Sequence, residues 1–185
     1  MISAVVILAG LLRFAGQGEP VDAQALIRSG DYEAAISTLE KALQVGEKGR
    51  GHEAAALALA VCYLSMGLFT RAGKALELLA PSASRSSRCR YVLAEVLASR
   101  GETAEAEKIL ASLSGKDGFP GATFRLSVLL FERGDYRNAA EHLAVLSEAG
   151  RLDYYGEIYR VRALLALDRA SEALAAIASL GKKHD

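Results

Sequence analysis

The feature that most constrains the fold is a short phrase that recurs along the chain. Residues 30–39 read GDYEAAISTL, and residues 134–143 read GDYRNAAEHL. The equivalent turn positions are Gly30, Gly67, Gly101, Gly134 and Asp168. By subtraction, successive turns lie 37, 34, 33 and 34 residues apart. A period in this range is typical of a stacked repeat array, in which no single unit can bury its apolar face alone.

Four columns of residues repeat in step with these turns. Five positions after each turn stands an alanine: Ala35, Ala72, Ala106, Ala139 and Ala173. Nine positions after it stands Leu39, Leu76, Leu110, Leu143 or Ile177. Four positions before it stands Leu26, Tyr63, Leu97, Leu130 or Leu164, and seven before it stands Ala23, Ala60, Ala94, Ser127 or Val161. Spacings of three and four put these residues on one face of each of two short helices, which the small residues allow to approach closely. A glycine at the turn supplies the left-handed backbone that ends the first helix.

Composition agrees with a helical chain. Three prolines, no tryptophan and no alternating run of β-branched residues predict an all-α protein. The 22 basic and 22 acidic residues cancel, which argues against bulk attraction to nucleic acid or to an anionic membrane. Cys62 and Cys89 lack the spacing of a zinc site or a disulfide framework, so we predict that both are small buried hydrophobes.

On these residues the chain resembles the tetratricopeptide repeat family, whose unit is a helix-turn-helix of about 34 residues with the same small and large columns. The resemblance covers roughly residues 19 to 180 and implies a right-handed α-solenoid of about five helix-turn-helix repeats. Departures are the missing early tryptophan, replaced by Ala56, Arg90, Thr123 and Glu157, and a closing proline kept only as Pro81 and Pro120. We divide the chain into an apolar segment (1–16), a repeat domain (17–180) and a polar tail (181–185).

Catalytic and metal-binding motifs are missing from the sequence. His52 begins HEAA, but Ala56 stands where the second histidine of a zinc-binding HExxH would be. Residues 114–121, SGKDGFPG, form no phosphate-cradling motif. The basic linker at residues 81–90 reads PSASRSSRCR and is a solvated loop, a phosphate or nucleic-acid contact, or a phosphorylation target. The solvated loop is favoured because no aromatic platform or second basic stripe accompanies the linker. We therefore predict a protein that is not an enzyme, uses no cofactor or metal and binds no nucleic acid.

In the tetratricopeptide family, the first helices of successive repeats line a concave groove that holds a partner peptide or helix. The matching positions here are Leu57, Val61 and Leu64, then Tyr91, Glu95 and Ala98, then Phe124, Val128 and Phe131, and finally Ile158, Arg162 and Leu165. The resemblance implies an adaptor, assembly factor or secretion-type chaperone that binds an apolar segment of a partner protein. On the alternative interpretation, some of these side chains belong to the core between repeats. Leu57 and Val61 replace the Lys and Asn of members that clamp a chaperone's C-terminal carboxylate, which disfavours that ligand.

A second function stays open, that of a structural scaffold whose repeats associate with other copies through their end faces and which residues 1–16 tether to a membrane. No polar capping helix follows Leu180, which keeps this hypothesis alive. Residues 1–16, MISAVVILAGLLRFAG, are too apolar for a surface helix and too short to span a bilayer. We weigh three interpretations of them: an export signal or membrane anchor, a helix buried on the first repeat, and a wrong start or fragment boundary. The expected location is correspondingly cytoplasmic, or exported or membrane-anchored.

Overall fold

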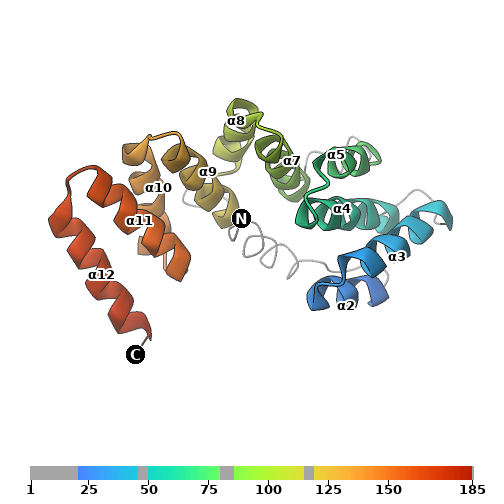
Figure 1. The fold of residues 1–185 in the computed structure, drawn as a ribbon, viewed down its shortest axis with the longest axis horizontal. Coiled ribbons are helices and arrows are strands. Elements are labelled where there is room, and N and C mark those ends of the chain that lie inside the picture. The colour runs from blue at the N-terminus through green and yellow to red at the C-terminus, as the bar shows by residue number, and fades with distance from the viewer. Residues whose placement is uncertain (1–20, 46–49, 80–85, 115–118, 185) are drawn as a thin grey trace. The chain divides into compact units, whose positions relative to one another are not determined.

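The computed structural model describes residues 21–45, 50–79, 86–114 and 119–184, which form ten α-helices and no strand (Figure 1). The helices are α2 (Val21–Ser29), α3 (Tyr32–Val45), α4 (Arg50–Ser65), α5 (Phe69–Glu77), α7 (Ser87–Ser99), α8 (Thr103–Leu113), α9 (Pro120–Glu132), α10 (Tyr136–Glu148), α11 (Tyr154–Ala166) and α12 (Ala170–His184). The predicted all-α class is confirmed. Residues 1–16, for which an anchor, an export signal or a buried helix was weighed, lie outside the described residues.

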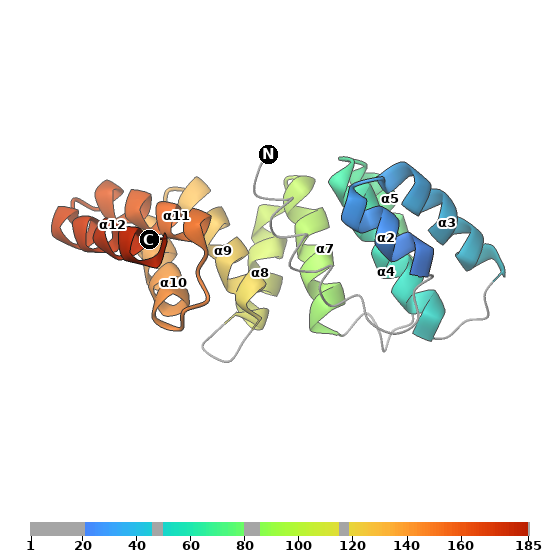
Figure 2. The same ribbon diagram turned by 90° about the horizontal axis from the view of Figure 1, so that it is seen from below.

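The chain divides after Ala106 into two compact units, each of which is described by itself. The first contains the hairpins α2–α3 and α4–α5 and the helix α7, and the second contains the hairpins α9–α10 and α11–α12 (Figure 2). The boundary falls inside α8, which follows α7 through the turn at Gly101. Within each unit, successive helices pack on one another, and α9 also contacts α11.

The five predicted turns are confirmed in backbone detail. Positive φ angles of 82°, 73°, 85°, 90° and 56° occur at Gly30, Gly67, Gly101, Gly134 and Asp168 respectively. After each of them the next amide donates back to the carbonyl four positions before the turn, as Asp135 does to Leu130 at 2.8 Å and Arg169 to Leu164 at 2.9 Å. This bond satisfies carbonyls that the helix end leaves without a partner. Asp168 adopts the left-handed conformation although it is not glycine, which puts strain at that turn.

Most residues of the repeat columns lie in the core, whereas Leu26, Leu76, Leu97 and Val161 are half-buried and Ile177 is exposed. All five alanines after the turns are at most 1 % exposed. Ala23, Ala60, Ala94 and Ser127 are fully buried on the first helices. In the second unit, Ala140, Ala163, Leu164 and Ala173 form one cluster, and Leu143, Leu146 and Leu152 form another. Small side chains at the crossings therefore bring the helix axes close, and larger ones fill the seams.

Three further observations concern the same described residues. Cys62 and Cys89 are free thiols and are both buried, as predicted. Across the four described stretches, no helix is long and apolar enough to cross a membrane. Within those stretches, no three His, Cys, Asp or Glu side chains come together in a way that could hold a metal ion.

Candidate interaction surface

The predicted groove residues fall into two groups. Val61, Tyr91 and Val128 are 5, 0 and 1 % exposed, so the expectation that they line an open groove is wrong. Their side chains point into the core because neighbouring helices cover that part of the first-helix face. The half-buried residues are Leu57, Leu64, Glu95, Ala98, Phe124, Phe131 and Ile158. Arg162 and Leu165 are exposed, so the accessible part of the predicted surface in the second unit lies on α9 and α11.

Four aromatic rings of the second unit form a connected row across α9, α10 and α11. Phe124 and Tyr159 have ring centroids 6.1 Å apart, and Tyr159 lies 5.5 Å from Phe131, both pairs in edge-to-face arrangements. Phe131 also meets Tyr136, at the start of α10, at 5.2 Å. Edge-to-face pairs add about 0.5 to 1.5 kcal/mol to the burial of their area. We call Phe124, Tyr159 and Phe131 the aromatic platform.

Tyr159 was missed by the sequence analysis. The predicted groove face of α11 consists of Ile158, Arg162 and Leu165, and Tyr159 lies beside that face. A signal was available, since Tyr159 stands three residues before Arg162, a spacing that makes two side chains neighbours on a helix. It contacts both aromatic rings of the preceding first helix, which join it to the predicted residues Phe124 and Phe131.

Arg162 lies over the aromatic platform. Its guanidinium carbon is 4.9 Å from the centroid of Phe131 and 5.7 Å from that of Tyr159. Both distances are within the range of a favourable cation–π contact, which contributes about 0.5 to 1 kcal/mol at an exposed site. The two rings come from different first helices, so the arginine bridges α9 and α11. The contacts hold a positive charge in a defined place on an otherwise apolar surface.

A buried polar network fixes α11 against α10 beneath this surface. Glu157 is 1 % exposed and accepts a hydrogen bond from the Ser147 hydroxyl at 2.6 Å. Arg160 donates to Ser147 at 3.1 Å and lies 3.4 Å from Glu157. The Asp153 side chain caps α11 by accepting from the Gly156 amide at 2.8 Å. These contacts set the rotation of α11 about its axis and therefore the direction of Tyr159 and Arg162.

Elsewhere in the two units, the shifted pKa values arise from helix packing, helix caps and ion pairs. Burial, and then a hydrogen bond to Glu40, raises the pKa of Tyr63 to about 12. Hydrogen bonds from Asn138, with Arg133 near, hold the pKa of Asp135 below its ordinary value, and this carboxylate caps α10. Arg169 lowers the pKa of Glu172 through a hydrogen bond. None of these groups lies in an arrangement of nucleophile and base.

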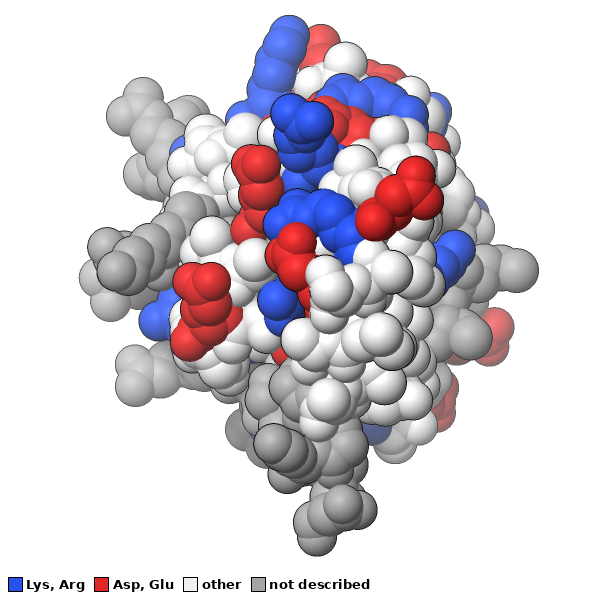
Figure 3. Space-filling model, turned by 90° about the vertical axis from the view of Figure 1, so that its left-hand side faces the viewer, with Lys and Arg blue, Asp and Glu red and all other residues white. Residues whose placement is uncertain are grey.

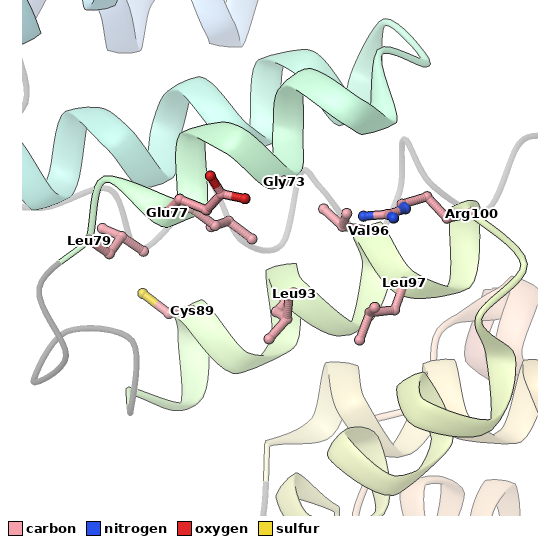
Figure 4. Close-up of a pocket in the computed structure, with 9 residues that line it drawn as sticks. Gly73, Glu77, Leu79, Cys89, Leu93, Val96, Leu97 and Arg100 are labelled. Carbon is pink, nitrogen blue, oxygen red and sulfur yellow. The ribbon is translucent and has the colours of Figure 1, made fainter.

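A cavity of about 240 Å³ lies between α5 and α7 in the first unit (Figure 4). Its lining is mostly apolar: Leu76, Leu79, Cys89, Leu93, Val96 and Leu97, with Gly73, Glu77 and Arg100. Figure 4 shows Cys89, Leu93 and Val96 of α7 facing α5 across it. Gly73 stands six positions after the turn at Gly67, and the same position in the fourth hairpin is Ala140, which packs against α11. The cavity therefore lies where a side chain is missing from the junction between two hairpins.

The last helix, α12, exposes an apolar face. The equivalent face of α10, inside the array, is buried. Leu174 and Ile177 on α12 are 66 and 48 % exposed, whereas the equivalent Ala140 and Leu143 on α10 are 3 and 0 % exposed. In the fourth hairpin α11 lies against this face, and no described helix follows α12. Figure 3 views this end of the molecule, where uncharged surface lies beside charges of both signs.

The fold and its repeat columns define the class of structure: the chain folds as a tetratricopeptide-like array of helical hairpins. A family model described as anaphase-promoting complex, cyclosome, subunit 3 matches residues 28–113. A comparison with curated proteins found no match.

Solved structures with similar folds include MamA, with a TM-score of 0.67 and 19 % identity over 87 % of this chain and 93 % of that one. A putative kinesin light chain from Podosopora anserina with nearly identical TPR-like repeats has a TM-score of 0.63 and 19 % identity, over 86 and 90 % of the two chains. A second structure of MamA, from AMB-1, has a TM-score of 0.62 and 18 % identity over 98 and 99 % of the chains. At these identities the likeness establishes the helical-repeat fold.

Proposed function

We propose that this chain is a non-catalytic interaction module that binds a peptide or helical segment of a partner protein on the first-helix face of its last two repeats. The observation that carries the proposal is the aromatic platform, which is half-buried on α9 and α11 and is crossed by an exposed arginine. Aromatic and arginine side chains dominate the binding energy of many protein interfaces because they bury large areas at a small entropic cost. The proposed roles are those of an adaptor, an assembly factor or a chaperone of the secretion type.

The apolar part of the ligand follows from the same surface. Ile158 and Leu165 lie on α11 on either side of Arg162, and Phe124 and Phe131 lie on α9. An aliphatic or aromatic side chain of the partner removes this area from water, which contributes about 25 cal/mol per Å². The segment is extended or helical, and a helix would present anchors at spacings of three and four.

The test uses the whole chain as bait for a displayed library of random dodecapeptides. Selected peptides are then measured against two variants, Ile158→Ser on the first-helix face and Leu174→Ser on the exposed face of α12. Both substitutions remove an aliphatic side chain from the same hairpin. The proposal expects Ile158→Ser to weaken binding and Leu174→Ser to leave it unchanged. Recovery of no peptide, or of peptides that respond only to Leu174→Ser, would overturn it.

A scaffold that associates with further copies through the end face is the second candidate. The exposure of Leu174 and Ile177 favours it, because the equivalent residues inside the array are covered by the next hairpin. Sedimentation velocity at increasing protein concentration measures this association. A concentration-dependent dimer that Leu174→Ser disperses would support the scaffold, and a monomer at every concentration would exclude it.

A further inference from the structure

We propose that the segment bound on α9 and α11 carries a carboxylate beside its apolar side chain, and that Arg162 binds this carboxylate. The inference rests on the proposed function and names the chemistry of the ligand at the same surface. The arginines of the second unit differ in whether a carboxylate of this chain pairs with them. Several arginines there have a carboxylate partner, as Arg133 has Glu107 at 2.6 Å and Arg169 has Glu172 at 2.7 Å. Arg162 contacts two aromatic rings, and no hydrogen bond or ion pair joins it to another described residue.

The ring contacts prepare the guanidinium for an anion. A guanidinium that contacts the face of an aromatic ring forms no N–H···O hydrogen bond with it, so its five N–H donors stay available for an anion. Those donors form a fork that matches the two oxygens of a carboxylate. An arginine already held by Phe131 and Tyr159 loses less rotamer freedom on binding than a free one. A neutral ligand would leave these donors to water and would use only the apolar part of the surface.

The geometry also places the carboxylate relative to the apolar anchor. Ile158 lies four residues before Arg162 on α11, which is about 6 Å along the helix axis at 1.5 Å per residue. Phe131 lies under Arg162, and Phe124 lies on the far side of Tyr159. A carboxylate on Arg162 and a side chain on Phe124 and Ile158 therefore belong to nearby positions of one partner segment. The predicted ligand is an aliphatic or aromatic residue with Asp, Glu or a free C-terminus within a few residues.

The buried network beneath explains why Arg162, and not Arg160, is assigned this role. Arg160 is committed to Ser147 and Glu157, and its side chain is only 23 % exposed. Burial of Glu157 makes that pairing costly to break, since the carboxylate would remain unpaired in the core. Arg162 stands two residues further along, on the exposed side of the same helix.

Selection from the dodecapeptide library tests the inference, with wild type, Arg162→Gln and Arg162→Glu as separate baits. Arg137→Gln is the matched control, because it removes an exposed arginine from the second helix of the neighbouring hairpin. We expect wild type and Arg137→Gln to enrich Asp or Glu beside an apolar residue, Arg162→Gln to lose the acidic enrichment, and Arg162→Glu to enrich Lys or Arg. All four proteins should have the same circular dichroism, and the two Arg162 variants should melt about 1 to 4 °C lower because they lose the exposed cation–π contact.

Synthetic peptides then give the size of the effect and the source of the carboxylate. For a selected peptide, Arg162→Gln should weaken binding by about twofold to fivefold at low salt, and added NaCl should abolish the difference because exposed pairs are screened. Glu→Gln in the peptide or amidation of its C-terminus identifies which carboxylate Arg162 binds. Peptides that depend on Ile158 but show no acidic preference would overturn this inference and leave the proposed function standing. Recovery of no peptide at all would overturn both.

Discussion

Replacement of Gly73 by alanine should stabilise the first unit. A Cβ built at this position would meet a guanidinium nitrogen of Arg100 and a methyl of Val96, both at 3.8 Å, which are ordinary van der Waals contacts. Gly73 lies inside α5, where glycine costs about 0.8 to 1 kcal/mol relative to alanine. The new methyl enters the apolar cavity beside α7 and adds up to about 0.8 kcal/mol for a fully buried carbon. Since Gly73 is only half-buried, we expect about 1 to 1.5 kcal/mol in all.

Urea denaturation followed by circular dichroism measures this change as a higher midpoint with an unchanged slope. Gly134→Ala is the matched control. A Cβ there has open space around it, but φ is +90°, so alanine is strained and the variant should lose about 1 kcal/mol or more. If Gly73→Ala were neutral or destabilising, the cavity between α5 and α7 would not have the size and contacts described, and the reasoning would fail.

Three further predictions follow from the same columns and contacts. Ala139→Leu should lower the free energy of unfolding by about 1 to 3 kcal/mol because Ala139 is fully buried at a helix crossing. Ala149→Leu, at an exposed position, is the control, and an unchanged melting temperature of Ala139→Leu would show that the close contact is misplaced. Asp168→Gly should raise the free energy of unfolding by about 0.5 to 1 kcal/mol, seen as a higher urea midpoint, because it relieves a left-handed aspartate. The reverse change, Gly134→Asp, should lower the midpoint. Phe124→Ala should weaken peptide binding by about 1 to 3 kcal/mol while most of the helical content is retained. Thermal melting of the variant shows whether Phe124 belongs to the surface or to the core, since loss of a core phenylalanine lowers the free energy of unfolding by about 3 to 5 kcal/mol.

The sequence alone was sufficient to predict the hairpins. The turns at Gly30, Gly67, Gly101 and Gly134 require a positive φ, which depends on the residue at the turn and its immediate neighbours. The alanine columns require close approach of two helices joined by a short turn, which is also a local demand. Asp168 was predicted from the period, because aspartate adopts the left-handed conformation far less often than glycine and is only a weak signal by itself. Gly150 has a φ of 64° at the end of α10 and was not predicted as such a turn, because it falls outside the repeated phrase.

The tertiary structure decided which first-helix residues are accessible. Tyr91 and Val128 occupy the same kind of helical position as Phe124 and Arg162, yet neighbouring helices bury the first two. Exposure at such positions depends on the rotation of each helix and on side chains contributed by the adjacent hairpin, and helical spacing fixes neither.

The same reason applies to the aromatic platform and to the ends of the array. Tyr159 joins Phe124 and Phe131 only because the buried Glu157 network orients α11, and Arg162 lies over two rings from two different helices. Ile177 belongs to a column whose other members are buried or half-buried, but it is itself exposed because no described helix follows α12 to cover this face. A repeated sequence gives each hairpin the same local instructions, and the neighbours of a hairpin determine which of its faces are core and which are surface.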